Sequence, residues 1–355
     1  MERALPMSER HYHTAGHTSA GRRRRRRRRS RIRPGCLLSL LVLLLALTGA
    51  FRLVSAHRFE KERYHAEDRA AVLASSAGIS GYYPMFAENL CVPEENAPAS
   101  DEGLLCEAGG LFNETGHTVL CSRNIYSRMN PASITKVMTA LLALENGNMD
   151  DVVTATDAVV ITEPGASLCG IAPGDQITMR ELMYGLLLPS GNDAANAIAV
   201  HLDGSVEAFA EHMNRRALEL GATGTHFTNP SGLTDDNHYT TAYDLYLIFR
   251  EAMKQPLFRE IISTASHDGV YTMAVGMPAL KKWENSNWYL AGKASAPEGL
   301  TVIGGKTGTT KAAGSCLIMG EEDASGNEYI SVVLKSPDRQ TLYSDMTNII
   351  SKAVN

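Results

Sequence analysis

Asn130-Pro131-Ala132-Ser133-Ile134-Thr135-Lys136 is the stretch on which the rest of the chain is interpreted, because it places a serine and a lysine one helical turn apart. Asparagine is a favoured N-cap and proline suits the first helical position, so the stretch predicts a helix that runs to about Asn146-Gly147. Apolar residues recur at helical spacing from Ile134 to Leu142, which predicts one buried face. Ser133 and Lys136 then share another face.

A serine and a lysine in this arrangement can act as a nucleophile and its base. A serine hydroxyl is a weak nucleophile until a nearby base takes its proton, and a lysine in a dry site loses part of its preference for the charged form. At average residue frequencies, a Ser-x-x-Lys pair occurs by chance roughly once in a chain of this length. The pair alone is therefore also compatible with a polar first turn on an ordinary core helix.

Two later stretches strengthen the catalytic interpretation. Ser190-Gly191-Asn192 separates two helical patterns and predicts a turn that points polar side chains into the gap between helices. Lys306-Thr307-Gly308-Thr309 follows the β-prone Thr301-Val302-Ile303. Each tripeptide is expected by chance in fewer than roughly one in ten chains of this length, so their joint presence favours a single catalytic site.

With these three motifs in this order, the chain resembles the penicillin-recognising serine enzymes, which carry S-x-x-K, S-x-N and K-T-G. Within that group it is most similar to the low-molecular-weight D-alanyl-D-alanine carboxypeptidases, which have a further block like Gly221 to Leu233 and His238 to Asp244. The resemblance covers about residues 108–350. It implies an α+β, β-lactamase/transpeptidase-like fold: an antiparallel five-stranded sheet covered by helices, plus a helical subdomain, with the active site between them.

The resemblance also implies a role for each motif residue. Ser133 attacks the carbonyl between the two terminal D-alanines of a peptidoglycan stem peptide and forms an acyl-enzyme, Lys136 takes its proton, and Ser190 relays a proton to the leaving nitrogen. The backbone N–H groups of Ser133 and Thr309 form the oxyanion hole. The residues implied in substrate binding are Asn192, Lys306, Thr307, Gly308 and Thr309. Catalysis in this family needs no cofactor, no metal site is predicted, and β-lactam antibiotics are the expected covalent inhibitors.

Three glycines of the K-T-G region are poor choices for an ordinary strand: Gly304, Gly305 and Gly308. Because a residue without Cβ lets another backbone approach, we expect a substrate peptide to lie alongside this strand. His238 and Asp244 are expected to be structural, since the catalytic roles are assigned elsewhere.

The remaining periodicity predicts strands near both ends of the domain and helices between them. A hairpin is predicted at Ala108 to Phe112 and Thr118 to Cys121. The later strands are predicted at Val270 to Val275, Thr301 to Lys306, Ser315 to Gly320 and Tyr329 to Lys335. The predicted helices after the Ser133 helix are Arg180 to Leu188, Asp193 to Leu202, Val206 to Leu220, Tyr243 to Met253, with Thr241 as a cap, and Arg339 to Lys352.

The N-terminal region has a different composition from the rest. Residues 1–35 hold twelve arginines, no lysine and two glutamates, whereas the whole chain has a net charge of −5. An apolar run from Cys36 to Phe51 follows. A basic flank before an apolar run predicts a cytoplasmic tail at 1–35 and a transmembrane signal-anchor or signal peptide at 36–56. We expect no nucleic-acid binding, because the acidic remainder repels nucleic acid.

A retained anchor is favoured over a cleaved signal, because the basic head is long for a signal peptide. Val54-Ser55-Ala56, with its small residues, keeps cleavage and secretion open. We expect a stalk and linker at 57–107, a penicillin-binding D,D-peptidase domain at 108–355, and attachment of that domain to the outer side of a bacterial cell membrane. Export permits a disulfide between Cys91 and Cys106, but the pairing of the exported cysteines stays open.

Two other functions and one variant remain open. A β-lactamase with a deacylating glutamate would show Glu-x-x-Leu-Asn after the second motif, and none occurs between Asn192 and Lys306. A non-catalytic penicillin-binding sensor is disfavoured because every catalytic residue type is present. Transpeptidation differs only in its acceptor, which the sequence does not specify.

Overall fold

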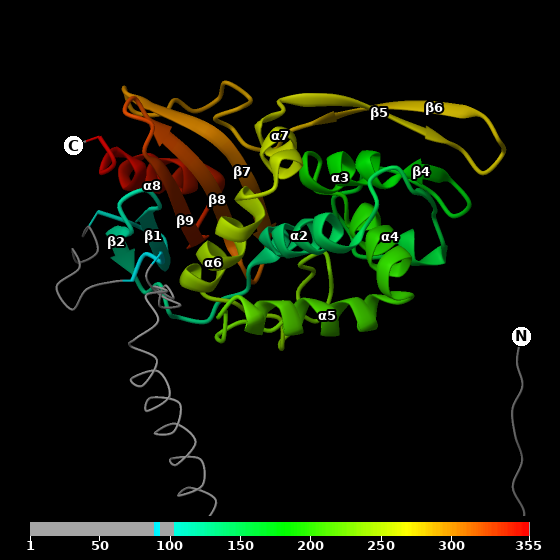
Figure 1. Ribbon diagram of the computed structural model, residues 1–355, viewed down its shortest axis with the longest axis horizontal. Coiled ribbons are helices and arrows are strands. Elements are labelled where there is room, and N and C mark those ends of the chain that lie inside the picture. The colour runs from blue at the N-terminus through cyan, green and yellow to red at the C-terminus, as the bar shows by residue number, and fades with distance from the viewer. Residues whose placement is uncertain (1–88, 93–102, 355) are drawn as a thin grey trace, which may run out of the picture. The chain divides into compact units, whose positions relative to one another are not determined.

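The computed structural model describes residues 89–92 and 103–354 (Figure 1). The chain divides into two units, residues 1–83 and 84–355, and all described residues belong to the second. The predicted basic tail, the predicted membrane segment at 36–56 and most of the predicted linker lie outside the described residues. Within the described part of the chain, no helix has the length and apolar character needed to cross a bilayer.

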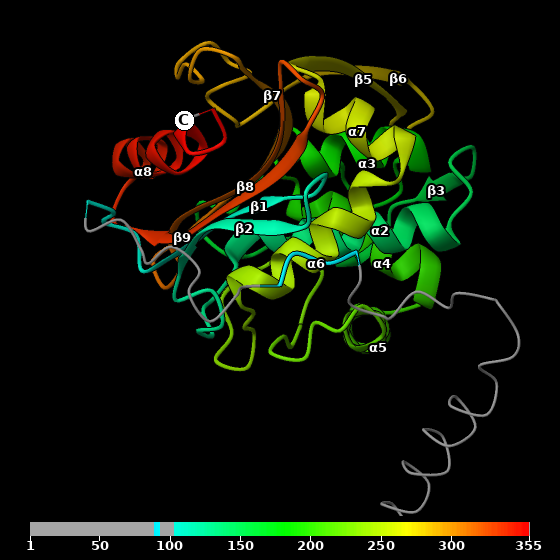
Figure 2. The same ribbon diagram turned by 60° about the vertical axis from the view of Figure 1, so that its left-hand side comes forward.

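An antiparallel five-stranded sheet with the strand order β2-β1-β9-β8-β7 confirms the expected central sheet. Its strands are β1 (Ala108–Asn113), β2 (Thr118–Arg123), β7 (Leu300–Thr310), β8 (Gly314–Asp323) and β9 (Glu328–Ser336). Both faces are covered, since α8 (Arg339–Ser351) packs on one and α6 (Ala242–Met253) on the other (Figure 2). The strand β7, which carries the K-T-G residues, therefore lies at one edge of the sheet.

The other helices form a lobe beside β7, as Figure 1 shows. They are α2 (Lys136–Asn146), α3 (Met179–Leu187), α4 (Asn192–Asp203), α5 (Val206–Glu219) and α7 (Pro256–Ser263). Apart from the start of α2, the predicted helices agree with these to within one or two residues, and the Thr241 side chain caps α6 by accepting the Asp244 N–H, as predicted. Only α7 among these helices was not predicted, because it is eight residues long and directly follows α6.

A second antiparallel sheet, with the strand order β3-β4-β5-β6, was not predicted. It contains β3 (Val152–Thr154), β4 (Gln176–Thr178), β5 (Ser266–Thr272) and β6 (Pro278–Glu284). The strand predicted at Val270 to Val275 is wrong in its bounds, because the chain already turns at Met273, whose N–H donates to the Met277 carbonyl. The partners were missed because two of them are three residues long and β6 is largely exposed.

The first turn around Ser133 also differs from the prediction. Residues Ala132–Thr135 form a 3₁₀ helix (η1), and the α-helix begins only at Lys136. Ala132 has a φ of +48°, which is strained for alanine. Asn130 is therefore not the N-cap of the α-helix; its side-chain oxygen accepts the Ala132 N–H at 3.0 Å and supports the turn. The helix ends at Asn146, as predicted.

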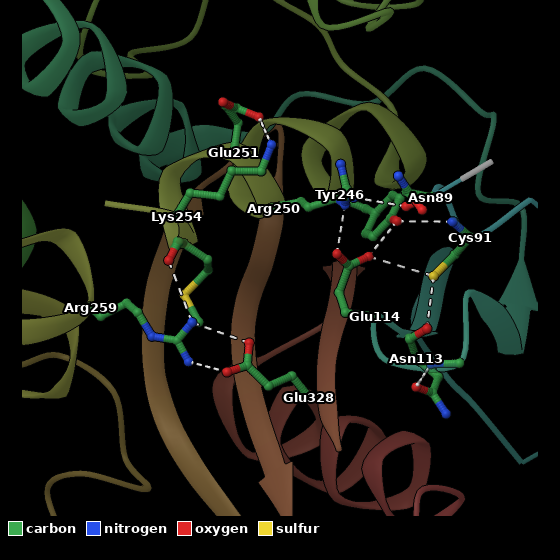
Figure 3. Close-up of polar contacts among 12 residues, drawn as sticks. Asn89, Cys91, Asn113, Glu114, Tyr246, Arg250, Glu251, Lys254, Arg259 and Glu328 are labelled. Carbon is green, nitrogen blue, oxygen red and sulfur yellow. Dashed lines mark hydrogen bonds and ion pairs between the residues drawn. The ribbon is translucent and has the colours of Figure 1, made fainter. Parts of the chain in front are cut away.

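Residues 89–92 bind the domain through a buried polar cluster at the end of β1 (Figure 3). The Cys91 N–H donates to the Tyr246 hydroxyl, and that hydroxyl and the Arg250 guanidinium both donate to the Glu114 carboxylate. The Cys91 thiol donates to a backbone carbonyl, and Cys106 is a separate buried thiol, so no disulfide joins these two cysteines. The chain before the first strand is thus fixed to α6 at this point.

Candidate active site

The 3₁₀ turn brings Ser133 and Lys136 together. Side chains at i and i+3 eclipse each other in a 3₁₀ helix, and Lys136 Nζ lies 3.0 Å from Ser133 Oγ. Lys136 Nζ is also 2.6 Å from Asn192 Oδ1 and 2.6 Å from the Ser231 carbonyl oxygen. The lysine is completely buried, so its amine meets these three oxygens in place of water.

An uncharged lysine can make all three contacts. Burial, assisted by the positive charge of Lys306, lowers the pKa of Lys136 well below its ordinary value, although Asp193 opposes the shift. A neutral amine has two N–H donors and one lone pair. The two donors fit the amide and carbonyl oxygens of Asn192 and Ser231, which only accept, and the lone pair then faces the hydroxyl proton of Ser133. The site therefore holds a base directed at the serine.

Ser190 lies in the turn between α3 and α4, where its φ of +65° is uncommon for serine. Its Oγ accepts a hydrogen bond from Lys306 Nζ at 3.0 Å, and Lys306 also donates to the Thr307 carbonyl at 2.7 Å. Burial, followed by the nearby Arg339 charge, lowers the pKa of Lys306 to about 7. Strained residues cluster at functional sites, and here the strain places a hydroxyl beside a buried amine.

The carboxylate of Asp193 fixes the loop that precedes β4 to the start of α4. Its oxygens accept the backbone N–H groups of Cys169 at 2.8 Å, Gly170 at 2.7 Å and Ile171 at 3.2 Å. Asp193 is almost fully buried. Asn192, one residue earlier, is thus held at the first position of a helix whose N-terminal end is anchored to a loop.

The glycines of β7 pack against this protein's own backbone. A Cβ at Gly304 would lie 2.2 Å from the Ile262 carbonyl, and one at Gly305 would lie 2.1 Å from the Ile318 carbonyl. A Cβ at Gly308 would lie 3.0 Å from the Ser133 nitrogen. These contacts explain the three glycines without a substrate, and the expectation that a substrate peptide lies alongside β7 stays a prediction. The glycines let β7 approach α7, β8 and the turn that carries Ser133.

A cavity of about 550 Å³ opens over these groups. Ser133, Asn192 and Thr309 line it, together with the segments 163–167, 232–234 and 310–312. Lys136, Ser190 and Lys306 lie behind this surface in the hydrogen bonds described above. The structure thus brings the S-x-x-K, S-x-N and K-T-G residues to one place. A second cavity, of about 130 Å³, lies among the ion pairs Arg250–Glu114 and Arg259–Glu328 shown in Figure 3.

His238 and Asp244 bind neighbouring threonines. His238 Nδ1 accepts the Thr228 N–H, so its Nε2 carries the proton and donates to Thr135 Oγ1 at 2.8 Å. Burial lowers the pKa of His238 to about 4, which keeps it neutral. Asp244 accepts a hydrogen bond from Thr225 at 2.6 Å. Among residues 89–92 and 103–354, no three His, Cys, Asp or Glu side chains gather as a metal site would require.

Four residues near the motifs were not assigned from the sequence: Asp193, Ser231, Ser286 and Arg339. Asp193 directly follows the second motif, and that position is the one signal that could have pointed to it. Ser231 contributes a backbone carbonyl, which any residue type would provide. Ser286, whose Oγ lies 2.6 Å from Thr307 Oγ1, and Arg339, which lies over the Trp288 ring, come from segments with no motif.

Comparison with known proteins gives consistent matches. Residues 108–338 match the family model described as D-alanyl-D-alanine carboxypeptidase. A D-alanyl-D-alanine carboxypeptidase of Streptomyces sp. K15 is 34% identical over 270 residues, which is 72% of this chain and 89% of that protein. The crystal structure of the Streptomyces K15 DD-transpeptidase aligns with a TM-score of 0.66 and 31% identity, covering 72% of this chain and 99% of that one.

Other relatives are longer than the matched region. The carboxypeptidase DacF of Bacillus subtilis is 35% identical over 48% of this chain, but the match spans only 44% of DacF. DacB2 of Mycobacterium tuberculosis is 38% identical over 55% of this chain, and the match spans 63% of DacB2.

Proposed function

Because this chain belongs to the D-alanyl-D-alanine carboxypeptidase family, we propose that it removes the terminal D-alanine from peptidoglycan stem peptides through an acyl-enzyme on Ser133. The observation that carries the proposal is the set of contacts around Lys136. Its Nζ lies 2.6 Å from two oxygens that only accept and 3.0 Å from Ser133 Oγ, so a neutral Lys136 that donates to the first two keeps its lone pair for the Ser133 hydroxyl. Such an amine is a base for one specific proton.

In the first step, Ser133 Oγ attacks the carbonyl carbon of the penultimate D-alanine while its proton passes to Lys136. The backbone N–H groups of Ser133 and Thr309 stabilise the negative oxygen that forms, and each such donor is worth about 3 kcal/mol. Gly308 supports this arrangement because a side chain there would separate β7 from the Ser133 turn.

In the second step, the C–N bond breaks and the leaving D-alanine nitrogen takes a proton. Ser190 delivers that proton and recovers one from Lys306, and the proton that Lys136 took from Ser133 passes back to Lys306, so both lysines return to their starting protonation states. The 3.0 Å contact between Ser190 Oγ and Lys306 Nζ supports this path. Water then attacks the ester, Lys136 takes the proton of the water, and the shortened peptide leaves with Ser133 restored.

Recognition of the terminal carboxylate comes from the K-T-G strand. The Thr307 and Thr309 hydroxyls donate to it, and Lys306 and Arg339 make the local potential positive. Asn192 orients both Lys136 and the substrate backbone. The same constellation accounts for acylation by β-lactams, which present a carbonyl and a carboxylate to the same groups.

The experiment that tests this proposal combines two measurements on the wild-type chain and on Ser133→Ala. One follows D-alanine release from a pentapeptide ending in D-Ala-D-Ala, and the other follows the mass of the protein after incubation with benzylpenicillin. Release of D-alanine and a covalent adduct are expected only with Ser133 present. An adduct without D-alanine release would indicate a sensor, and rapid loss of the drug without an adduct would indicate a β-lactamase.

The proposal extends to the location of the enzyme. The basic residues 1–35 and the apolar run Cys36 to Phe51 support an anchor in the cell membrane with the domain on the outer side, where stem peptides are found. Protease added to intact cells is expected to degrade the domain but leave the basic tail protected. A domain that resists protease until the cells are lysed would contradict this arrangement.

A further inference from the structure

We propose that Ser286 is a positioning residue for the terminal carboxylate of the substrate and acts through the Thr307 hydroxyl. The inference rests on the proposed function, in which Thr307 donates a hydrogen bond to that carboxylate. Ser286 Oγ lies 2.6 Å from Thr307 Oγ1, and the two hydroxyls belong to segments 21 residues apart. Ser286 follows β6 in a loop that carries none of the three motifs.

The backbone on both sides of Ser286 is fixed by buried asparagines. The Asn285 side-chain amide donates to the carbonyls of Ile262 at 3.3 Å and Thr264 at 3.0 Å, at the end of α7. The Asn287 N–H donates to Asn285 Oδ1 at 3.0 Å. Asn285 is 8% exposed and Asn287 is completely buried. The Ser286 hydroxyl is therefore held near Thr307 by contacts that do not depend on the hydroxyl itself.

Counting protons gives this contact a direction. A hydroxyl has one proton to donate and two lone pairs that accept. When Thr307 gives its proton to a bound carboxylate, it has none left for Ser286, so Ser286 must donate to Thr307. The result is a chain from Ser286 to Thr307 to the carboxylate, in which each hydrogen bond strengthens the next. Without the Ser286 hydroxyl, Thr307 donates a weaker hydrogen bond, and its hydroxyl group rotates more freely about the Cβ–Oγ1 bond.

The location of this pair fits an anionic group. Thr307 and Thr309 are two residues apart and therefore lie on the same side of β7, and Thr309 lines the large cavity. Arg339 supplies positive charge at the same end of the site, since its guanidinium lies 5.8 Å from the Trp288 ring centre and is close enough to lower the pKa of Lys306. A carboxylate is attracted to this end, and a neutral ester is not.

The test uses the full chain in detergent, with the variants Ser286→Ala and Ser286→Thr. Rates of acylation are measured by protein mass with benzylpenicillin, which has a free carboxylate, and with its methyl ester, which does not. Losing one hydrogen bond between two neutral hydroxyls corresponds to about a fivefold change. We therefore expect Ser286→Ala to lower the acylation rate by about fivefold with benzylpenicillin and by less than about twofold with the ester. Ser286→Thr, which keeps a hydroxyl, is expected to retain most of the rate.

The control is Ser263→Ala, which removes an exposed serine hydroxyl at the end of α7 that donates to the Glu260 carbonyl. It is expected to leave both rates unchanged. Equal losses with the two compounds in Ser286→Ala, or no loss with either, would overturn the positioning role. Acylation is measured separately from D-alanine release, so a wild-type chain that is acylated but releases no D-alanine refutes the proposed function while still testing Ser286. A wild-type chain that reacts with neither compound refutes both.

Discussion

Replacing Glu321 by glutamine should make the free energy of unfolding less dependent on pH. Glu321 lies on β8, is completely buried, and accepts a hydrogen bond from the Ser331 hydroxyl through one oxygen only. Its other oxygen has no hydrogen-bond partner within the described residues. Burial therefore raises the pKa of Glu321 well above its ordinary value of 4.5. The folded protein holds the neutral acid, whereas the unfolded chain ionises above pH 4.5.

The sign and size of the effect follow from proton linkage. Above pH 4.5 the unfolded chain binds fewer protons at this position than the folded protein, so the free energy of unfolding falls as pH rises. Each pH unit in this window contributes about 1.4 kcal/mol. Between pH 4.5 and pH 6, Glu321 should therefore remove about 2 kcal/mol from the wild-type stability, and Glu321→Gln should abolish this loss. A glutamine amide without a partner adds a cost, but that cost does not change with pH.

The assay is urea unfolding at several pH values, followed by tryptophan fluorescence. Both tryptophans of the chain, Trp283 and Trp288, lie in the described domain, so the signal reports the unfolding of that domain in the full chain. The matched control is Glu322→Gln, one residue along the same strand but exposed, which should follow the wild-type curve. Wild-type and Glu321→Gln curves that stay parallel from pH 4.5 to pH 6 would refute a buried neutral carboxyl.

Three further predictions concern the site and its support. Lys306→Gln removes the cation that lowers the pKa of Lys136. Because Lys136 must be neutral to take the Ser133 proton, the acidic limb of the plot of acylation rate against pH should move to higher pH. An acidic limb that does not move would argue against this coupling. Glu114→Gln removes the charged partner of Arg250 and should cost about 2 kcal/mol of unfolding free energy, measured in urea, with acylation unchanged. Gly232→Ala should abolish acylation, because its Cβ would lie 1.8 Å from the carbonyl oxygen of Ala132 at a φ of +83°; a fully active variant would show that this turn can move.

The sequence predicted the parts of the fold that have strong local signals. The long amphipathic helices show clear periodicity, and β8 and β9 read as runs of mostly apolar residues. Glu114-Thr115-Gly116 is a turn signal between the strands of the hairpin β1–β2. The second sheet was missed because β3 and β4 are too short to show a period. The 3₁₀ turn before α2 was missed because proline and asparagine fit a regular helix start equally well, whereas the φ of +48° at Ala132 depends on the loop packed against it.

The residues of the candidate site also fall into those that local sequence signals identify and those that they do not. Residues whose role depends on their chemical type, such as Ser133, Lys136 and Lys306, could be chosen from motif spacing alone. Residues whose role depends on a long-range approach could not. The Ser231 carbonyl reaches Lys136 across 95 positions, and Ser286 reaches Thr307 from a loop that follows an exposed strand. Glycines were identified correctly as unusual, but the backbone that lies against them belongs to this protein, which a local pattern could not show.

The two buried lysines show why the motifs must come together in three dimensions. Each lysine alone would be charged in water, and two charged lysines buried in one site would repel each other. Burial lowers the pKa of both, and the charge of Lys306 lowers that of Lys136 further. Lys136 has two acceptor oxygens and one hydroxyl around it, which suits a neutral amine, whereas Lys306 lies near Arg339 at the end that attracts a carboxylate. A bound anion favours the charged form of Lys306, and that charge in turn keeps Lys136 neutral. A substrate carboxylate that favours charged Lys306 would therefore increase the fraction of Lys136 that is neutral and able to take a proton.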